Sequence, residues 1–559
     1  MVENSYWQNF FKSIRPSYQM PSRYQISNKL LNDEYESIKF DVYAKIKQAS
    51  TVAIQCDGWS NIRNEAVINF IVTTPKPVLF KTMTTGAERH TGEYIAEELL
   101  KCIAEVGEEK IFAVVSDNAT AMEKAKKIVT TKYPYVTGYS CAAHTLNLLV
   151  EDIMKLQSLK NVESSCRALI NEIRGSHINQ ATFNKIQIEK YGKVTSLKLP
   201  VKTRWGSILY CLNSLLITKQ ALQLLVISQD GEGIKLSKTT RHHILDNDVF
   251  WIRLEKIKSI LEPIVKWITL LEGDSAKMSQ VYVAVAEIDA CIKTNVKALP
   301  VSSSEEKELI TLFEKRKCMM LKPIHLSAYL LDPHYCGQEL SNEQHVTAMQ
   351  FIDSTLSNHP QFQQHKQTIC VELTNYLAKS DMWSVDFVWQ VASNTDSIAW
   401  WQGICNKTNL KDLAVAIIGL SPSSAATERS FSTYSVLHCK RRNLLTSERA
   451  GKLLYVSHNS KLLDGETSYN FNYVYDNPIP NVLLLGEKSA PTISLVNEPS
   501  TSKEEERNTS KSIPTVPLES DSDSESDSEN ECEISIHDSN SSIGAEEFSD
   551  LDDSDSKQK

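Results

Sequence analysis

The chain has 559 residues, 41% of them hydrophobic, so it is long enough to bury several cores, and its formal net charge is −9. No apolar run reaches the ~18 residues of a membrane-spanning helix, and the first residues lack the basic and apolar regions of a secretory signal. Its 12 cysteines lie singly with no CxxC pair, which favours reduced thiols in a cytosolic or nuclear protein over a disulfide scaffold.

The first 157 residues predict a helical segment followed by a mixed α/β domain. Residues 1–48 have helical periodicity and are rather polar. Strands are then predicted at 51–56, 66–74, 78–85, 111–116 and 135–140, and helices at 92–104, 119–130 and 141–156. Three strands in short succession, followed by alternating helices and strands, indicate a ribonuclease H-like α/β fold over residues 49–157.

The remainder of the chain predicts helices and then a charged tail. Residues 158–405 are almost entirely helical in pattern, and residues 406–465 are helical and apolar. A linker is expected at 466–487, and the Ser-, Asp- and Glu-rich segment 488–559 is expected to be disordered. This tail carries 19 acidic and 6 basic residues, a net charge of −13, so the preceding 487 residues have a net charge of +4.

Three acidic residues are candidates for a metal site. Asp57 ends the first predicted strand and Asp117 ends the fourth, and these strands are neighbours in a ribonuclease H-like sheet. Two carboxylates placed in this way can share divalent cations for phosphoryl transfer. The alternative is that each aspartate caps a loop or the next helix.

Glu428 is the third candidate. Ser421-Pro422 is a helix-start signal, which places Glu428 about two turns into a helix of small residues. The alternative is a solvated glutamate paired with Arg429 or Lys440.

Several short sequence motifs, taken in order, resemble those of the hAT superfamily of DNA transposases, in the group allied to BED zinc-finger proteins. The motifs are Asp57-Gly-Trp-Ser, Ser116-Asp-Asn-Ala, Cys141-Ala-Ala-His-Thr-Leu-Asn-Leu, Thr203-Arg-Trp, Leu331-Asp-Pro and Ser423-Ser-Ala-Ala-Thr-Glu-Arg-Ser-Phe-Ser. They span about residues 20–462. The resemblance implies a ribonuclease H-like core interrupted by a large all-helical insertion, and a C-terminal dimerisation region at 406–465 that completes the core. The dimer interface is expected on two apolar faces of this region, with closing the core as their alternative role: Leu413, Ala414, Ile417, Ile418 and Leu420, and Leu453, Leu454 and Val456.

The resemblance also implies roles for individual residues. The family's acidic triad falls on Asp57, Asp117 and Glu428, which would hold Mg²⁺ or Mn²⁺. Trp205, beside Arg204, matches the tryptophan that supports the DNA end during hairpin formation, with ordinary packing as the alternative. A homodimer, DNA as a further partner and a nuclear location follow, with no membrane and no small-molecule cofactor.

Cys141 and His144 lie at i and i+3, which could form half of a zinc site, but no second ligand pair is evident. Since the family keeps this Cys-x-x-His in its core, we expect a structural role. Basic clusters at 315–317 and 440–442 could serve nuclear import or phosphate contact, or form a solvated helix face.

Three departures from the family leave the activity open. The paired Cys and His of a BED finger are not found before Asp57, His334 stands where arginine is usual after Leu-Asp-Pro, and the acidic tail is extra. The intact triad favours a Mg²⁺-dependent transposase that cuts and joins DNA. The departures favour the alternative, a catalytically silent domesticated transposase acting as a nuclear dimerising or chromatin-associated protein.

Overall fold

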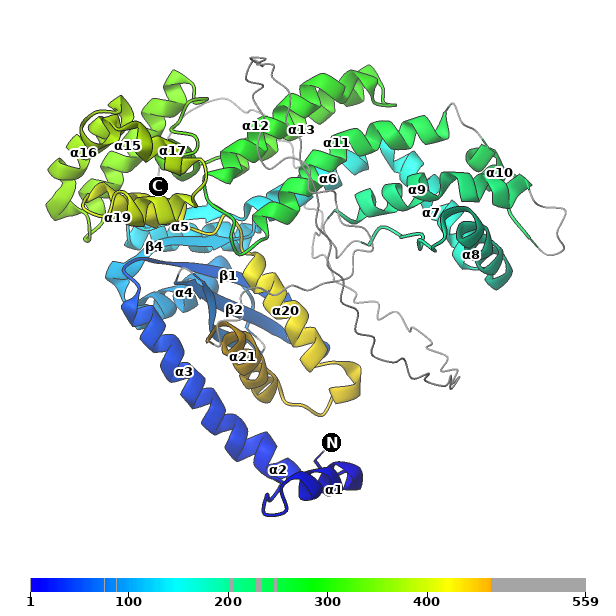
Figure 1. Cartoon of the computed structure of the whole chain (residues 1–559), viewed down its shortest axis with the longest axis horizontal. Coiled ribbons are helices and arrows are strands. Elements are labelled where there is room, and N and C mark those ends of the chain that lie inside the picture. The colour runs from blue at the N-terminus through cyan, green and yellow to red at the C-terminus, as the bar shows by residue number, and fades with distance from the viewer. Residues whose placement is uncertain are drawn as a thin grey trace, which may run out of the picture. The chain divides into compact units, whose positions relative to one another are not determined.

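The computed structural model describes residues 2–463, apart from gaps at 75, 87, 202–205, 228–233 and 246–248. The predicted linker at 466–487 and the predicted disordered tail at 488–559 therefore lie outside the described residues, as do Arg204 and Trp205. Figure 1 shows the arrangement of the helices and strands.

The described chain is mostly helical and contains a mixed five-stranded sheet in the order β3-β2-β1-β4-β5. The strands are β1 (Val52–Ser60), β2 (Ala66–Thr73), β3 (Pro77–Thr84), β4 (Ile111–Ser116) and β5 (Thr137–Ser140). β1 pairs antiparallel with β2 and β2 with β3, whereas β1, β4 and β5 run parallel. The predicted sequence of strands and helices is the observed one, with ends displaced by a few residues.

Side-chain composition explains which strands are central. All of β4 and the first six residues of β1 are buried, as expected for strands with a covered surface on both sides. The edge strand β3 is covered by α21 (Ser447–Leu463), where the Asn459 amide pairs with both backbone groups of Leu79 at 2.9 Å. This side chain replaces a neighbouring strand and so blocks further pairing at that edge.

Helices from both ends of the described chain cover the sheet. These are α3 (Leu31–Gln48), α4 (Gly92–Val106), α5 (Thr120–Lys132), α20 (Ala425–Leu437) and α21. α20 packs against β1 and β2, and α21 packs against β3 and α3 (Figure 1). Ala426, Tyr434 and Leu454 are buried with the strand residues in one core. The chain therefore returns to its sheet about 285 residues after its last strand, β5, ends.

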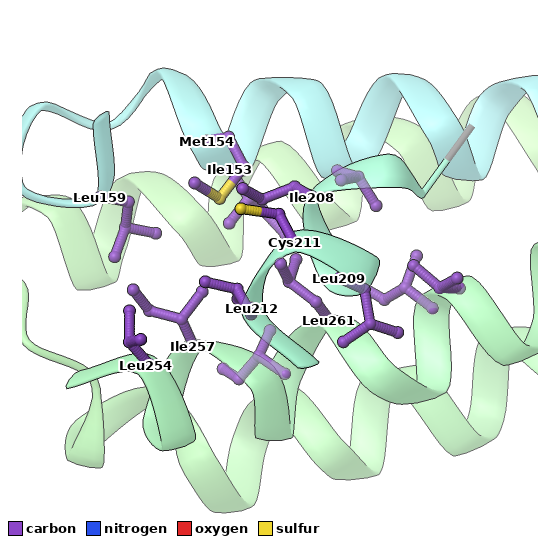
Figure 2. Close-up of a cluster of buried hydrophobic side chains, with 14 of the residues drawn as sticks. Ile153, Met154, Leu159, Ile208, Leu209, Cys211, Leu212, Leu254, Ile257 and Leu261 are labelled. Carbon is purple, nitrogen blue, oxygen red and sulfur yellow. The ribbon is translucent and has the colours of Figure 1, made fainter. Parts of the chain in front are cut away.

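The segment between α5 and α20 forms β5 and a long series of helices. They are α6 (Ala142–Lys155), α7 (Gln157–Arg174), α8 (His177–Tyr191), α9 (Ser207–Ile227), α10 (Lys238–Leu245), α11 (Phe250–Leu271), α12 (Gln280–Asn295), α13 (Ser303–Met320), α14 (Pro323–Leu331), α15 (Asn342–Asn358), α16 (Lys366–Ala378), α17 (Asp386–Ala392), α18 (Ser397–Gly403) and α19 (Leu410–Ile418). Figure 2 shows part of the core that α6, α7, α9 and α11 share, including Ile153, Leu159, Leu212 and Leu261.

Among the described helices, α9 alone is long and apolar enough to cross a membrane by length and composition. Half of it is buried inside the protein, against α8 and α11 among others. Core helices of water-soluble proteins share this pattern, so α9 by itself is weak evidence for a membrane.

The apolar face of α19 corrects one expectation. The sequence assigned Leu413, Ala414, Ile417, Ile418 and Leu420 to a dimer interface. The structure instead buries all five in a core with α14 and α16 within one chain. An apolar stripe shows only that a face is covered, and here the cover comes from the same molecule.

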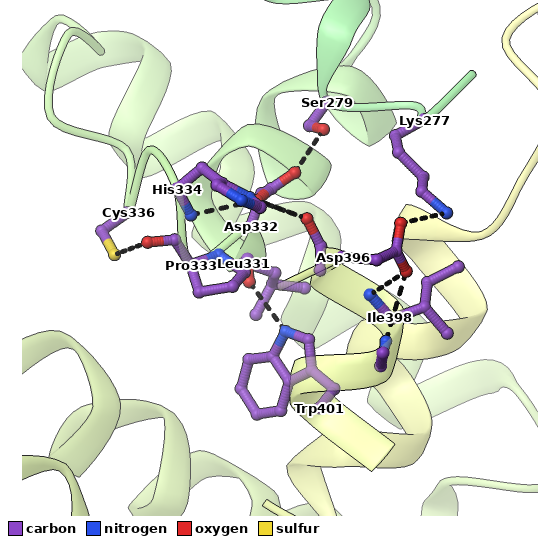
Figure 3. A network of polar contacts seen from close by, with 12 residues as sticks. Lys277, Ser279, Leu331, Asp332, Pro333, His334, Cys336, Asp396, Ile398 and Trp401 are labelled. Atoms are coloured by element: carbon purple, nitrogen blue, oxygen red, sulfur yellow. Dashed lines mark hydrogen bonds and ion pairs between the residues drawn. The ribbon is translucent and has the colours of Figure 1, made fainter. Parts of the chain in front are cut away.

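A buried aspartate ties α12, α14 and α18 together (Figure 3). Asp332 is 2% exposed, and its carboxylate accepts hydrogen bonds from Ser279 at 2.6 Å and Ser397 at 2.8 Å. The His334 ring lies 2.8 Å from the same carboxylate, and Asp332 raises the pKa of His334. The histidine that replaces the expected arginine thus still contacts Asp332, and this contact favours its protonated form.

Candidate carboxylate site

The strand register places Asp57 and Asp117 side by side. Gln55 on β1 is opposite Val115 on β4, and each aspartate lies two residues further along the chain, which places Asp117 directly after β4. Because the strands are parallel neighbours, both side chains stand at the same edge of the sheet, on strands about 4.8 Å apart. Asp57 is almost fully buried and Asp117 is partly exposed.

Local hydrogen bonds hold one or both oxygens of each aspartate. The backbone N–H of Gly58 donates to Oδ1 of Asp57 at 2.7 Å, and the Thr427 hydroxyl lies 3.5 Å from Oδ2. Oδ1 of Asp117 accepts the backbone N–H of Ala119 at 3.1 Å, just before α5 begins. Asp117 therefore also fixes the loop before α5, which is the capping role that the sequence analysis gave as the alternative to metal binding. Its second oxygen makes no hydrogen bond to any residue that the structure describes.

The segment before α20 is bonded to the start of α6. The Tyr139 hydroxyl donates to the backbone oxygen of Ser421 at 2.6 Å, and the N–H of Ala142 donates to that of Pro422 at 3.0 Å. These contacts bring a distant part of the chain to the edge of the sheet where β4 and β5 end.

The helix that carries Glu428 begins later than predicted. α20 starts at Ala425 with Ser424 as its N-cap, because Ser421 and Pro422 are engaged with β5 and α6 instead of opening a helix. Glu428 therefore lies in the first turn of α20. Two residues further on, the Ser430 hydroxyl accepts a hydrogen bond from the Asn69 amide at 2.7 Å, and Asn69 is the β2 partner of Asp57.

The carboxylates perturb one another. Burial raises the pKa of Asp57 to about 8, helped by the negative charge of Asp117 and opposed by the hydrogen bonds from Gly58 and Thr427. Burial also raises the pKa of Glu428 well above its usual range, with repulsion from Asp57, Glu272 and Asp117 adding to it. A carboxylate whose charge raises the pKa of another in this way lies near it in a region of low polarity.

Glu272, the C-cap residue of α11, is an acid near this site that the sequence did not single out. Burial raises its pKa to about 7, although Arg429 opposes the shift. The Arg429 guanidinium donates to the backbone oxygen of Glu272 at 2.6 Å and pairs with Asp274. Arg429 thus fastens α20 to the end of α11 and does not pair with Glu428, contrary to the alternative given above. The sequence feature that could have indicated Glu272 is an acidic residue directly after the apolar Leu271, at the predicted end of a helix.

The carboxylates of Asp57, Asp117 and Glu428 are suitable ligands for a hard divalent cation, but their side chains do not converge on one point. Carboxylate oxygens are the ligands that Mg²⁺ and Mn²⁺ prefer. Within residues 2–463, gaps aside, no three His, Cys, Asp or Glu side chains stand close enough to hold a metal ion. Asp57, Asp117 and Glu428 would therefore have to draw together, and a cation would relieve the repulsion that, with burial, raises the pKa values of Asp57 and Glu428.

Cys141 and His144 support the start of α6. The Cys141 sulfur is fully buried, and the backbone N–H groups of His144 and Ser424 both point to it at 3.4 Å. Burial, with the nearby charge of Glu428, raises the pKa of this thiol to about 12, so it is neutral at pH 7. Burial lowers the pKa of His144, while Asp117 opposes that shift. In this arrangement Cys141 is a helix cap that joins α6 to α20.

Two family models match the N-terminal half. Residues 21–169 match "Domain of unknown function (DUF659)", and residues 139–246 match "ZBED1 RNase-like helical domain". The chain is 26% identical over 263 residues to "Putative AC9 transposase" of Zea mays, an alignment that covers 44% of this chain and 31% of the maize protein. It is also 26% identical over 242 residues to "Putative AC transposase" of Zea mays, covering 40% and 29%. The aligned part thus spans about three tenths of each maize protein.

Proposed function

Because the chain is an hAT-family, transposase-derived protein, we propose that it binds DNA and cuts and joins DNA strands with Mg²⁺ or Mn²⁺ held by Asp57, Asp117 and Glu428. One observation carries this proposal. Asp57 and Glu428, 371 positions apart in the sequence, come into one buried region, where the charge of Asp57 helps to raise the pKa of Glu428. A fold that only needed packing at this place would gain stability from apolar side chains there.

The strand order supports a ribonuclease H-like core for this chemistry. We infer that the sheet and α4, α5, α20 and α21 form that core, that the helices from α7 to α18 are its insertion, and that α20 completes it. The order β3-β2-β1-β4-β5, with only the first three strands antiparallel, is the one that such a core requires.

The chain's own residues prepare the site. When bound, divalent cations would stabilise the attacking and leaving oxygens of a phosphodiester. Gly58 and Thr427 orient Asp57, and the Ala119 N–H orients Asp117. The buried setting strengthens every charge interaction made there. Arg204 and Trp205 are proposed to contact the DNA end, on the resemblance alone.

We further propose a nuclear homodimer formed through residues 406–465. Since the apolar face of α19 is buried in the core, the dimer interface must use other side chains. Val436 and Leu444, which are 70% and 89% exposed, are the apolar residues that we assign to it. Light scattering of the full chain should give twice the monomer mass, and Val436→Asp with Leu444→Asp should halve it. A monomer at micromolar concentration in the unmutated protein contradicts the dimer.

The test of activity uses a supercoiled plasmid carrying the DNA that flanks the gene. We expect nicking or cleavage with Mg²⁺ or Mn²⁺, lost in Asp57→Asn, Asp117→Asn and Glu428→Gln. Asp33→Asn, which removes an exposed acid of α3, is the matched control and should cut normally. If the unmutated chain cuts nothing with either metal, the catalytic proposal fails and the silent, dimerising alternative takes its place.

A further inference from the structure

Four basic side chains gather where two turns of the core meet. Arg63 lies in the turn between β1 and β2, and Lys440, Arg441 and Arg442 form the short helix η6 (Lys440–Arg442) between α20 and α21. The Arg63 guanidinium donates to the backbone oxygen of Asn443, which joins the two turns. We call these four residues the basic ledge. All four are exposed, and none forms an ion pair with any residue that the structure describes.

The ledge is built on fixed backbone. The Asn61 side chain accepts the backbone N–H groups of Arg63 at 2.9 Å and Glu65 at 3.0 Å. Glu65, the one acid in residues 61–65 and 438–446, is engaged by the Asn61 amide and by the Ser447 hydroxyl. These hydrogen bonds lower the pKa of Glu65, so it stays ionised and the two turns keep a net charge of +3. A fixed surface with excess positive charge is suited to a polyanion.

α20 connects the ledge to the carboxylate site. It begins beside Asp57, where Thr427 makes its contact, and runs along β1, where the rings of Phe431 and Trp59 stack at 5.7 Å. It then ends before η6 (Figure 1). From Glu428 to the end of α20 is about 14 Å at 1.5 Å per residue. The ledge thus lies roughly 15–20 Å from the carboxylates, about five base pairs of duplex at 3.4 Å each.

We propose that the basic ledge binds the phosphates of duplex DNA about five base pairs from the phosphodiester at the carboxylate site. This inference rests on the proposed function and adds the surface that carries the DNA. Phosphate contacts of this kind fix position and supply affinity without reading sequence. Nuclear-import sequences and nucleic-acid patches are both basic and of similar length, so the length of the run does not decide between them. Here three residues sit in a short helix followed directly by Asn443, which Arg63 holds, and this favours a rigid phosphate contact.

The test compares the full-length protein with Lys440→Gln/Arg441→Gln/Arg442→Gln on a random 30-base-pair duplex from 50 to 200 mM salt. Each phosphate contact contributes about 0.9 to the slope of log affinity against log salt. Losing three contacts should lower the slope by about 2.7, so the unmutated protein should weaken about 40-fold more than the variant over this range. Lys127→Gln/Lys132→Gln/Lys160→Gln, which removes three exposed lysines without described ion pairs, should keep the full slope.

The outcomes separate the two proposals. If the unmutated protein does not bind duplex at 50 mM salt, the proposed function fails. If it binds and the ledge variant keeps the same slope, the ledge proposal is overturned. It is equally overturned if the variant binds normally but a fluorescent fusion no longer accumulates in the nucleus, since the triplet then serves import. Should the triple variant not fold, Arg441→Gln alone, with an expected slope loss of about 1, gives the same answer.

Discussion

Replacing Asp57 by asparagine should stabilise the metal-free protein, and the gain should grow with pH. The substitution keeps the size of the side chain and its acceptor for the Gly58 N–H, but removes the negative charge. The folded-state pKa of Asp57 is raised, to about 8, so the folded protein holds this proton over a range where the unfolded chain has lost it. Stability must then fall as pH rises from about 4 to 8.

The size of the effect follows from the shift. A carboxyl group moved from its ordinary pKa of 3.8 to about 8 loses about 1.4 kcal/mol for each unit, or at most about 6 kcal/mol above pH 8. Part of this energy is repulsion from the partly exposed Asp117, which salt in the buffer screens in part. We therefore expect Asp57→Asn to be more stable than the unmutated protein by about 2–4 kcal/mol at pH 9 and by less than about 1 kcal/mol at pH 5.

Urea denaturation of both proteins at pH 5, 7 and 9, with chelator present, measures this difference. Adding millimolar Mg²⁺ or Mn²⁺ at pH 8 should stabilise the unmutated protein and leave the variant nearly unchanged, because only the former keeps the full set of carboxylates. The exposed Asp33→Asn controls for a general effect of charge. If the unmutated protein and Asp57→Asn differ by the same amount at every pH, Asp57 is not held in the environment described above.

Three further predictions concern other parts of the chain. Asp332→Asn should cost about 3 kcal/mol in urea denaturation, since the buried Ser279 and Ser397 hydroxyls and the His334 ring lose an ionised acceptor. Burial raises the pKa of Asp332, but its hydrogen bonds outweigh burial and lower it, so the stability it confers should disappear as pH falls below about 4. Cys141→Ala should cost about 1–2 kcal/mol through the lost cap, whereas Cys141→Ser should recover most of it, both read as midpoints of thermal unfolding. Removing residues 488–559 changes the formal charge from −9 to +4, so fluorescence anisotropy on random duplex should show tighter binding at low salt and no difference at high salt.

The local sequence pattern was sufficient to predict the order of strands and helices and the positions of Asp57 and Asp117 at the ends of their strands. Asp57 and Asp117 each end a short apolar run, and parallel neighbouring strands bring such ends together, so their meeting follows from topology alone. The start of α20 was misplaced because Ser421 and Pro422 satisfy their backbone through Tyr139 and Ala142, which lie far away in sequence. Capping statistics do not include such tertiary partners.

The remaining errors have the same physical origin. The apolar stripe of α19 has the composition of an interface and of a core alike, and only the position of α14 and α16 decides between them. Glu272 is unremarkable in sequence, and it becomes part of the carboxylate site only because Arg429 holds the end of α11 against α20. Both features depend on which surfaces meet, and hydrophobic periodicity contains no information on that.

The return of α20 to the sheet has a consequence for the protein during its own synthesis. When β1 and β4 have emerged from the ribosome, more than 300 residues remain to be made before Glu428 follows. An unfinished or prematurely terminated chain therefore displays two of the three carboxylates and lacks the helix that carries the third. Any capacity to cut DNA would appear only in finished molecules, so the order of the chain itself acts as a check against damage by fragments.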